Sequence, residues 1–379
     1  MSLSPESPSP PHPRRRAALR ALIADAGLDA MLITDLINIR YLTGFTGSNA
    51  ALLLATSGDE SSVFCTDFRY TGQAREEVPD LVTVIDRASD LALLSRTPGT
   101  RLGFESHVVS VARYAELAAS LAGGTELTGQ QGLVEGLRAV KDAGEVASLR
   151  AACEIADAAL AGLIQAGAIR AGRTEREVAL DLDERMRRLG SQDISFPTIL
   201  AAGENSAIPH HQPGDRKLAA GDLVKIDFGA VVDGYHSDTT RTVVLGAPAS
   251  WQVDLHELVA RAQQAGRGAI HPGVALADVD DAARGVIVTA GFGERFGHGL
   301  GHGVGLQVHE APWFPSVGAP SGGAGPNSRA GRMIADMTVT VEPGVYLPGR
   351  GGVRIEDSGV VGPDGYLPLT LAPRDLVVL

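Results

Sequence analysis

Two aspartates in the C-terminal part of the chain have the residue type and spacing of a metal-binding hairpin. Asp227 ends a largely apolar run that begins at Leu223, and Asp238 lies beyond the turn formed by Asp233 and Gly234. Such positions can oppose each other on adjacent strands, so that the two carboxylates converge. Because exposed carboxylates are common on protein surfaces, this pair alone leaves a solvated role open.

Two glutamates repeat the arrangement further along the chain. Glu342 follows the β-branched run from Thr338 to Val341, and Glu356 follows Val353 and Ile355. Carboxylates beside core-forming runs are costly to bury without a compensating charge. A pair of divalent cations supplies that charge, and oxygen-rich ligation suits hard or borderline ions such as manganese.

Between the two hairpins lies the glycine-rich segment FGHGLGHGVGLQVHEAP, which contains His298, His302 and His309. It has neither the Lys-Ser/Thr of a P-loop nor the strand-to-helix context of a dinucleotide site, which excludes a phosphate-binding loop. Glycines let the backbone approach a metal centre closely, while imidazole supplies a nitrogen ligand and a proton carrier. One histidine alone would suggest a core or surface residue, but three so close together indicate a site.

The elements that carry these residues repeat within the C-terminal region. The segment from Arg170 to Gly190 reads as turn, helix and glycine, and the segment from His271 to Gly291 reads the same way. Thr174 and Glu177 form a capping-box signature at the start of the first helix. The hairpin at 221–246 likewise has a counterpart at 337–362. Each half therefore offers a hairpin that carries two carboxylates.

The N-terminal part of the chain alternates helix and strand patterns. Helical spacing from Arg14 to Gly27 precedes strand-like runs at 30–34, 51–55, 62–66 and 81–85, which indicates a small α/β domain. A long Ala-rich helical pattern follows from Glu145 to about Ala166. We expect a disordered tail over residues 1–13, an N-terminal domain over 14–137 and a catalytic domain over 138–379.

Charge and composition argue against several classes of partner. The net charge of -12 and the pI near 5.3 disfavour nucleic acid and anionic membranes. No apolar stretch approaches the roughly 20 residues of a membrane helix, and Arg20, Asp25 and Asp29 break the segment that an export signal needs. Cys65 and Cys153 lack a CxxC spacing and suit a reducing compartment. We expect a cytoplasmic protein with no nucleic-acid or membrane partner.

Blocks along almost the whole chain resemble one family. TDLINIRYLTGFTGSNA and CTDFRYTGQA resemble a creatinase-like N-terminal domain, and the catalytic blocks follow in order: SFPTILAAGENSAIPHHQPGD, IDFGAVVDGYHSDTTRT, GHGLGHGVGLQVHEAP, TVEPGVYLPG and GGVRIEDSGVV. They resemble the pita-bread metallopeptidases, in particular the Xaa-Pro aminopeptidases (aminopeptidase P) and Xaa-Pro dipeptidases (prolidases). The resemblance implies an α/β creatinase-like domain followed by an α+β pita-bread catalytic domain with a pseudo-twofold internal repeat.

The resemblance also implies a metal-ligand set. Asp227 would bind one ion, Asp238 and Glu356 would bridge both ions, and His302 with Glu342 would complete the site of the other. Two divalent ions are implied, with manganese expected from the family. Cobalt and zinc are alternatives, because carboxylate and imidazole ligands accept them as well.

Catalytic and substrate-binding roles follow from the same resemblance. Glu342 would take a proton from the metal-bridging water and deliver it to the leaving imino nitrogen. His210 and His309 would donate hydrogen bonds to the tetrahedral intermediate and to the substrate backbone. Arg354 and His298 match supporting positions, and the expected substrate contacts are those of His210, His298 and His309.

The leading hypothesis is a dinuclear-metal Xaa-Pro aminopeptidase, which hydrolyses the bond between an N-terminal residue and a following proline by means of a metal-bridging hydroxide. The alternative is an Xaa-Pro dipeptidase. That enzyme needs a cation for the substrate carboxylate, and Arg329 and Arg332 are candidates. A non-catalytic pita-bread peptide-binding module is a remote alternative, which the complete set of ligand positions disfavours.

Further expectations concern the surroundings of the site. Trp313 or Phe314, in the Gly- and Pro-rich loop at 312–332, is a candidate for the wall of a prolyl pocket. Asp336 stands where the family commonly has glycine, which changes a turn and not a ligand. His211 is expected to be a neighbour without a direct role. The resemblance implies a homodimer that acts on proline-containing peptides.

Overall fold

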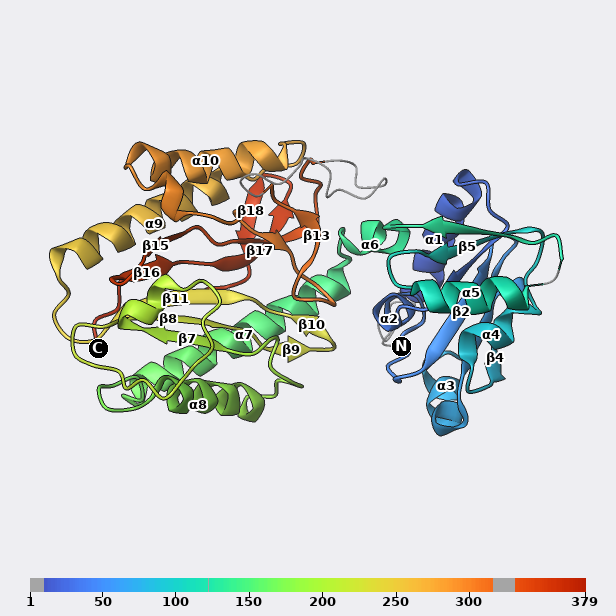
Figure 1. Ribbon diagram of the computed structural model, residues 1–379, viewed down its shortest axis with the longest axis horizontal. Helices are drawn as coiled ribbons and strands as arrows, with labels where there is room; N and C mark the ends of the chain where they lie inside the picture. The colour runs from blue at the N-terminus through green and yellow to red at the C-terminus, as the bar shows by residue number, and fades with distance from the viewer. Residues whose placement is uncertain (1–9, 122, 316–330) are drawn as a thin grey trace, which may run out of the picture. The chain divides into compact units, whose positions relative to one another are not determined.

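The structure is a computed structural model that describes residues 10–121, 123–315 and 331–379. The described residues form two compact units, one up to Arg138 and the other from Ala139 onward. Figure 1 colours the first unit from blue to green and the second from green to red. None of the helices in these residues is long and apolar enough to cross a lipid bilayer.

The first unit is built on a six-stranded sheet with the strand order β4-β3-β2-β1-β5-β6. The β1–β2 and β2–β3 pairs are antiparallel, and the other three pairs are parallel. The strands are β1 (Ala30–Ile33), β2 (Ala50–Ala55), β3 (Val63–Thr66), β4 (Val82–Ile85), β5 (Arg101–Glu105) and β6 (Glu126–Gln130). The helices are α1 (His12–Asp25), α2 (Leu36–Thr43), α3 (Thr71–Glu77), α4 (Ser89–Leu94), α5 (Val111–Ser120) and α6 (Leu133–Arg138), with 3-10 turns at Asp59–Ser61 and Phe68–Tyr70.

The central strands of this sheet are apolar along their whole length because both faces are covered. Every residue of β1 and β2 is buried, and Leu32 and Leu53 share one apolar core. Helix α1 begins at His12, two residues before the expected start, because Pro13 in its first turn already has the backbone angle of a helix. Residues 12 and 13 therefore belong to the helix and not to the predicted tail.

The second unit consists of two similar halves. The first half has helices α7 (Ala143–Gln165) and α8 (Glu175–Arg188) and a sheet ordered β11-β8-β7. The strands of this half are β7 (Ile199–Ala202), β8 (Leu223–Phe228), β9 (Val231–Val232), β10 (Tyr235–His236) and β11 (Thr239–Val244). Strands β9 and β10 form a separate two-stranded ribbon, and the 3-10 turn η3 covers Gly203–Ala207. The predicted capping box of Thr174 and Glu177 starts α8, and Asp142 with Glu145 forms another at α7.

The second half repeats this pattern. It has helices α9 (Ser250–Ala269) and α10 (Leu276–Thr289) and a sheet ordered β13-β12-β14-β17-β18. Its strands are β12 (His302–Gly303), β13 (Glu310–Trp313), β14 (Thr338–Val341), β15 (Gly344–Leu347), β16 (Gly351–Arg354), β17 (Asp357–Gly362) and β18 (Gly365–Pro368), with a 3-10 turn at Gly293–Arg295. Helices α8 and α10 both have 14 residues and both lead to a left-handed glycine, Gly190 or Gly291. The predicted internal repeat is confirmed.

The two hairpins share one topology. Strands β8 and β11 pair antiparallel, and the ribbon of β9 and β10 lies between them in sequence. Strands β14 and β17 pair in the same way around the ribbon of β15 and β16. At the tip of the first ribbon, Asp233 (φ 49°) and Gly234 (φ 76°) form a left-handed two-residue turn. The equivalent strand ends of the two hairpins therefore carry the acidic residues.

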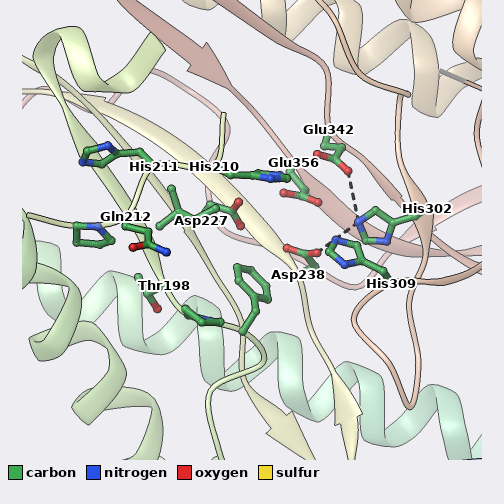
Figure 2. Close-up of a pocket in the computed structure, with 14 residues that line it drawn as sticks. Thr198, His210, His211, Gln212, Asp227, Asp238, His302, His309, Glu342 and Glu356 are labelled. Atoms are coloured by element: carbon green, nitrogen blue, oxygen red, sulfur yellow. Dashed lines mark ion pairs between the residues drawn. The ribbon is translucent and has the colours of Figure 1, made fainter. Parts of the chain in front are cut away.

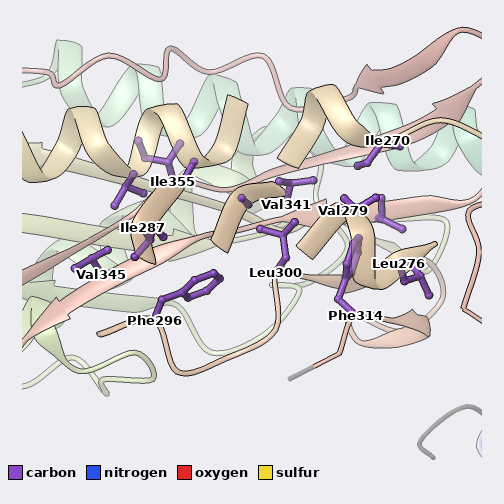
Figure 3. Packing of buried hydrophobic residues seen from close by; sticks show 14 of the residues in the cluster. Ile270, Leu276, Val279, Ile287, Phe296, Leu300, Phe314, Val341, Val345 and Ile355 are labelled. Carbon is purple, nitrogen blue, oxygen red and sulfur yellow. The ribbon is translucent and has the colours of Figure 1, made fainter. Parts of the chain in front are cut away.

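Each half packs its helices on its strands through an apolar core. Helices α9 and α10 lie on one side of the strands, and α7 and α8 lie on the other (Figure 1). Leu182 and Ile226 belong to the core of the first half, and Val279, Val341 and Phe314 belong to that of the second (Figure 3). This packing holds the strands rigidly, which is what a site on their ends requires.

Candidate metal centre and active site

The four predicted carboxylates lie together at the ends of the two hairpins (Figure 2). Asp227 lies on β8, and Asp238 immediately precedes β11, its antiparallel partner. Glu342 and Glu356 flank the last rung of the β14–β17 pair in the same way. The hairpin register therefore brings two carboxylates from each half to one place.

Their oxygen atoms form groups that could each hold a cation. The ligand atoms of Asp227, Asp238 and Glu356 lie within 4.8 Å of one another, and so do those of His302, Glu342 and Glu356. Glu356 is common to both groups. In a third group, Asp238 and His302 are joined by His309. The structure thus brings all five expected ligands together.

His302 is oriented as a neutral nitrogen ligand. Its Nδ1 lies 3.0 Å from the carbonyl oxygen of Gly303 and donates to it, so that Nε2 keeps its lone pair. This Nε2 faces Asp238 Oδ2 at 3.6 Å and Glu342 Oε1 at 3.4 Å. Burial, together with His309, lowers the pKa of His302 to about 3. A Cβ atom on Gly301 would lie 2.2 Å from the Thr340 carbonyl oxygen, so the position beside His302 requires glycine.

Two oxygen atoms of the buried carboxylates have no hydrogen-bond donor among the described residues. Asp227 Oδ1 and Glu356 Oε1 are buried without a hydrogen bond from any described residue. Burial and the neighbouring carboxylates raise the pKa values of Asp238 and Glu356, and burial raises the pKa of Glu342 to about 8. Clustered anionic oxygens without donors are stabilised by cations. This donor set fits two divalent metal ions.

Arg354 and Thr240 orient these carboxylates from behind. Arg354 Nη2 donates to Asp227 Oδ2, and Thr240 Oγ1 donates to Glu356 Oε2 at 2.7 Å. Arg354 Nε in turn donates to Thr240 Oγ1 at 3.0 Å. Each of the two carboxylates therefore has one oxygen held by the protein and the other directed into the cluster.

His298 lies behind this support and does not line the pocket. Its Nδ1 donates to the Gly299 carbonyl oxygen at 2.9 Å, and its Nε2 accepts from the Tyr346 hydroxyl at 2.9 Å. Tyr346 Oη accepts from Arg354 Nη1 at 2.9 Å. Burial lowers the pKa of His298 to about 4. Because both ring nitrogens are engaged, this geometry does not support the expected substrate contact of His298.

The carboxylates form the floor of a pocket of about 560 Å³, a size that suits a short peptide. The lining residues are Phe196, Pro197, Thr198, Ile199, His210, His211, Gln212, Pro213, Asp227, Asp238, His302, His309, Glu342 and Glu356. Phe196, Pro197 and Ile199 give it an apolar wall that the sequence analysis did not single out. The Phe-Pro pair just before β7 was the available signal.

His309 reaches the pocket on a loop that a buried ion pair fixes. Its ring lies edge-on to that of His302, with centroids 4.3 Å apart. The next residue, Glu310, accepts a hydrogen bond from Lys141 Nζ at 2.7 Å, and the side chains are only 3% and 1% exposed. A buried pair of opposite charges at this distance holds the loop firmly.

His210 reaches the pocket on a second loop, which a second buried lysine contacts. Lys225 Nζ donates to the carbonyl oxygens of Ile208 at 2.6 Å and Pro209 at 3.1 Å. Burial, with the charge of Arg354, lowers the pKa of Lys225 to about 6. Sequence reasoning missed Lys225, although a lysine inside the apolar run LVKIDF was a signal.

Other expectations about the surroundings are not met. Phe314 is buried in the second-half core, and Trp313 stands half exposed beside His309 with ring centroids 6.4 Å apart; neither lines the pocket. Arg332 donates to the Gly273 carbonyl oxygen at 2.7 Å and is also not part of the lining. Arg329 lies outside the described residues.

The expectation for Asp336 agrees with the structure. Its φ is 68°, a left-handed conformation that glycine adopts most easily, so aspartate in place of glycine affects a turn and not a ligand.

Comparison with known proteins gives the same picture over nearly the full chain. Residues 147–363 match metallopeptidase family M24, and residues 15–140 match the creatinase/prolidase N-terminal domain. An uncharacterized peptidase of Bacillus subtilis (strain 168), YqhT, is 38% identical over 366 residues, which cover 95% of this chain and 99% of that protein.

Two solved structures are similar along almost their whole length. An Xaa-Pro dipeptidase from Bacillus anthracis has a TM-score of 0.88 and 34% identity, and the match covers 97% of this chain and 99% of that one. An X-Pro aminopeptidase from Thermotoga maritima MSB8 has a TM-score of 0.83 and 34% identity, with 96% and 99% covered.

The fold and the donor set define a creatinase-like domain joined to a pita-bread metallohydrolase, as the motifs implied. The chain belongs to metallopeptidase family M24. Members of this family bind two divalent metal ions. The expected fold class and family are thereby confirmed.

Proposed function

We propose that the protein is an Xaa-Pro dipeptidase that hydrolyses the bond between an N-terminal residue and a C-terminal proline. The convergence of the acidic and imidazole groups on the floor of a pocket with an apolar wall carries the proposal, because it joins a hydrolytic centre to a surface suited to proline. The Bacillus anthracis relative supports the dipeptidase over the aminopeptidase that the motifs had placed first.

In this proposal Asp227, Asp238, His302, Glu342 and Glu356 would hold the two metal ions. When bound, the ions supply a water that is acidic enough to act as a nucleophile and an electrophile for the scissile carbonyl. The unpartnered oxygens of Asp227 and Glu356 support these assignments. Manganese remains the expected metal.

The chain's own side chains then move the proton and hold the substrate. Glu342 Oε1 faces the pocket and accepts a proton from water, which it returns to the nitrogen of the leaving proline. The imidazole N–H groups of His210 and His309 donate to the substrate carbonyl oxygen as negative charge develops there. Arg354 acts indirectly, by holding Asp227.

The apolar wall sets the position of the proline ring. Phe196, Pro197 and Ile199 line the pocket on the side of β7, where an apolar five-membered ring can pack against them. We propose that this wall takes over the role that the sequence analysis gave to Trp313 or Phe314.

One observation favours an Xaa-Pro aminopeptidase as the second candidate. No lysine or arginine side chain is present in the described lining of the pocket, so a free substrate carboxylate would meet only imidazole groups there. The similar X-Pro aminopeptidase structure is consistent with this reading.

Hydrolysis of Ala-Pro and Ala-Pro-Ala by the metal-loaded protein separates the two candidates. A dipeptidase cleaves Ala-Pro and leaves Ala-Pro-Ala intact, whereas preferential cleavage of the tripeptide overturns the proposal in favour of the aminopeptidase. Cleavage of neither, with Gly-Leu as a non-prolyl comparison, would exclude both. The homodimer and the cytoplasmic location stay predictions, which sedimentation analysis and fractionation can test.

A further inference from the structure

The His210 imidazole forms no hydrogen bond with a described residue, so the backbone that carries it matters for its position. His210 lines the pocket, its side chain is exposed, and no described residue forms a hydrogen bond with the ring. It lies after η3, in a segment without helix or strand. Figure 2 shows the ring directed toward Glu356, while that of His211 points away. The groups that hold the backbone on either side of His210 therefore determine the point from which its side chain enters the pocket.

Lys225 fixes the backbone before His210. Its side chain is fully buried on β8, and its two hydrogen bonds to the Ile208 and Pro209 carbonyl oxygens are its polar contacts. Side chains two residues apart on a strand point to the same face, so Lys225 and the expected metal ligand Asp227 project together. The lysine therefore ties the loop to the strand that carries a ligand.

Glu175 fixes the backbone after His210. This fully buried carboxylate, at the start of α8, accepts from His211 Nε2 at 2.8 Å and from the Gly214 N–H at 3.1 Å. It also accepts from the Ala202 N–H at 2.8 Å, at the end of β7. His210 is thus the residue between two anchored points.

A lysine is an expensive way to satisfy two carbonyl groups. Burying an amine without a counter-charge costs free energy, and Pro209 already receives a longer hydrogen bond of 3.3 Å from Arg354 Nη1. The Tyr346 ring, 5.1 Å from Nζ, offers only a partial compensation. Lys225 therefore contributes more than the pairing of two carbonyl groups: it fixes the loop of His210 to the strand of Asp227.

We propose that Lys225 is a positioning residue for His210, which holds the Ile208 and Pro209 carbonyl groups so that the His210 imidazole faces the substrate before it binds. The inference rests on the proposed function, because it assigns Lys225 to the histidine that this function uses. It differs from a general stabilising role in one respect: its effect on activity passes through His210.

A double-mutant cycle of Lys225→Met with His210→Ala tests this dependence. Lys225→Met alone is expected to lower kcat/KM about tenfold to a hundredfold, because a small misplacement of a catalytic group has effects of this size. In the His210→Ala background the same change is expected to lower kcat/KM less than about threefold. Equal losses in both backgrounds would overturn the proposal.

The exposed Lys217→Met is the matched control, because it removes a lysine from the same stretch of chain without touching a buried carbonyl. It is expected to leave kcat/KM unchanged. Lys225→Gln, which keeps a donor on a shorter side chain, serves in the same cycle where Lys225→Met does not fold. The same dependence on His210 is expected of it, and additive losses overturn the proposal here too.

A readout that does not need turnover separates this proposal from the proposed function. In 15N-histidine-labelled protein, Lys225→Met is expected to shift or broaden the His210 ring signal, identified by its absence in His210→Ala, and to leave that of His309 in place. Calorimetric Mn2+ affinity is expected to change less than about threefold. An unmoved His210 signal, or a loss of Mn2+ affinity as large as the loss of activity, would refute the positioning role. Absence of Xaa-Pro cleavage in the wild type would instead refute the proposed function.

Discussion

The two halves of the catalytic unit place a pocket histidine by different electrostatics. Lys141, which precedes α7, and Glu310, at the start of β13 in the second half, form a buried ion pair at 2.7 Å beside His309. In the first half, Lys225 binds only the neutral carbonyl groups that precede His210. One loop is held by an ion pair, and the other by an amine that donates to neutral carbonyl groups. Each half thus supplies a pocket histidine, but different interactions hold the loops that carry them.

The proposed metal centre is the part to which both halves contribute, and its loss has the largest expected effect. Glu356→Gln removes charge from a group common to both clusters, so that neither half retains its full donor set. We expect kcat on an Xaa-Pro substrate to fall by more than about a hundredfold, since removing a mere neighbour of a metal ligand already costs 10- to 100-fold. Steady-state assays with added Mn2+ measure the loss, and activity within tenfold of wild type would contradict the assignment.

Chelation provides the matching experiment on the unaltered chain. Treatment with a chelator followed by gel filtration should remove activity, and Mn2+ should restore it. The histidine loops of both halves should keep their folds, since the buried lysines that hold them bind protein groups. Retention of full activity after verified metal removal would contradict a metal-dependent mechanism.

The ion pair beside His309 should contribute more to stability than the buried lysine of the first half. Lys141→Met removes the cationic partner of the buried Glu310 carboxylate, and we expect the free energy of unfolding to fall by about 3–5 kcal/mol. Urea unfolding monitored by circular dichroism measures this. In the double variant Lys141→Met with Glu310→Gln, much of the loss should be recovered, because the buried negative charge is removed together with its cation; an additive loss would argue against the pairing.

Lys225→Met should cost less stability, and this difference sharpens the comparison. It leaves two carbonyl groups without their donor but no opposite charge, so we expect a loss of about 2 kcal/mol or less in the free energy of unfolding. The same urea experiment, run beside Lys141→Met, measures the ratio. A larger loss from Lys225→Met would reverse the order proposed for the two halves.

A buried histidine on α9 gives the second half an acid sensitivity that α7, its counterpart, lacks. Burial lowers the pKa of His256 to about 4. Below pH 6.5 this histidine is therefore protonated in the unfolded chain while it stays neutral in the native state. Its contribution is therefore complete above about pH 6.5 and is lost as the pH falls toward 4. We expect His256→Gln to reduce the stability loss between pH 7 and 5 by about 1–2 kcal/mol. Identical pH profiles for wild type and variant would contradict this.

The acidic cluster could be predicted from the sequence, because the signals for it come from short stretches of the chain. Strand periodicity and the Asp-Gly turn give the hairpin of Asp227 and Asp238, and the repeat gives its counterpart. The capping box at Thr174 and the strands of the first unit were likewise readable from short segments. Such features depend on residues that are neighbours in the chain.

The missed features depend on residues that are distant in the chain. Glu175 meets His211 across 36 positions, and Lys141 meets Glu310 across 169, so neither partner could be inferred from spacing. Trp313 and Phe314 were plausible pocket residues by type, but packing against the second-half core decides the place of Phe314. Tertiary contacts alone reveal which charged groups are buried and what they hold.

Arg241 has a consequence for the order in which the catalytic unit can fold. Its guanidinium donates through Nε to the Pro373 carbonyl oxygen, through Nη1 to those of Thr240 and Glu356, and through Nη2 to Asp357 Oδ1 and the Ala372 carbonyl oxygen. All five N–H donors are used, and four of the acceptors lie more than a hundred residues downstream. During synthesis the strand that carries Arg241 leaves the ribosome long before these partners exist. The interior around Arg241 is therefore completed only after residues 356–373 have emerged, which places this part of the first half late in folding during synthesis.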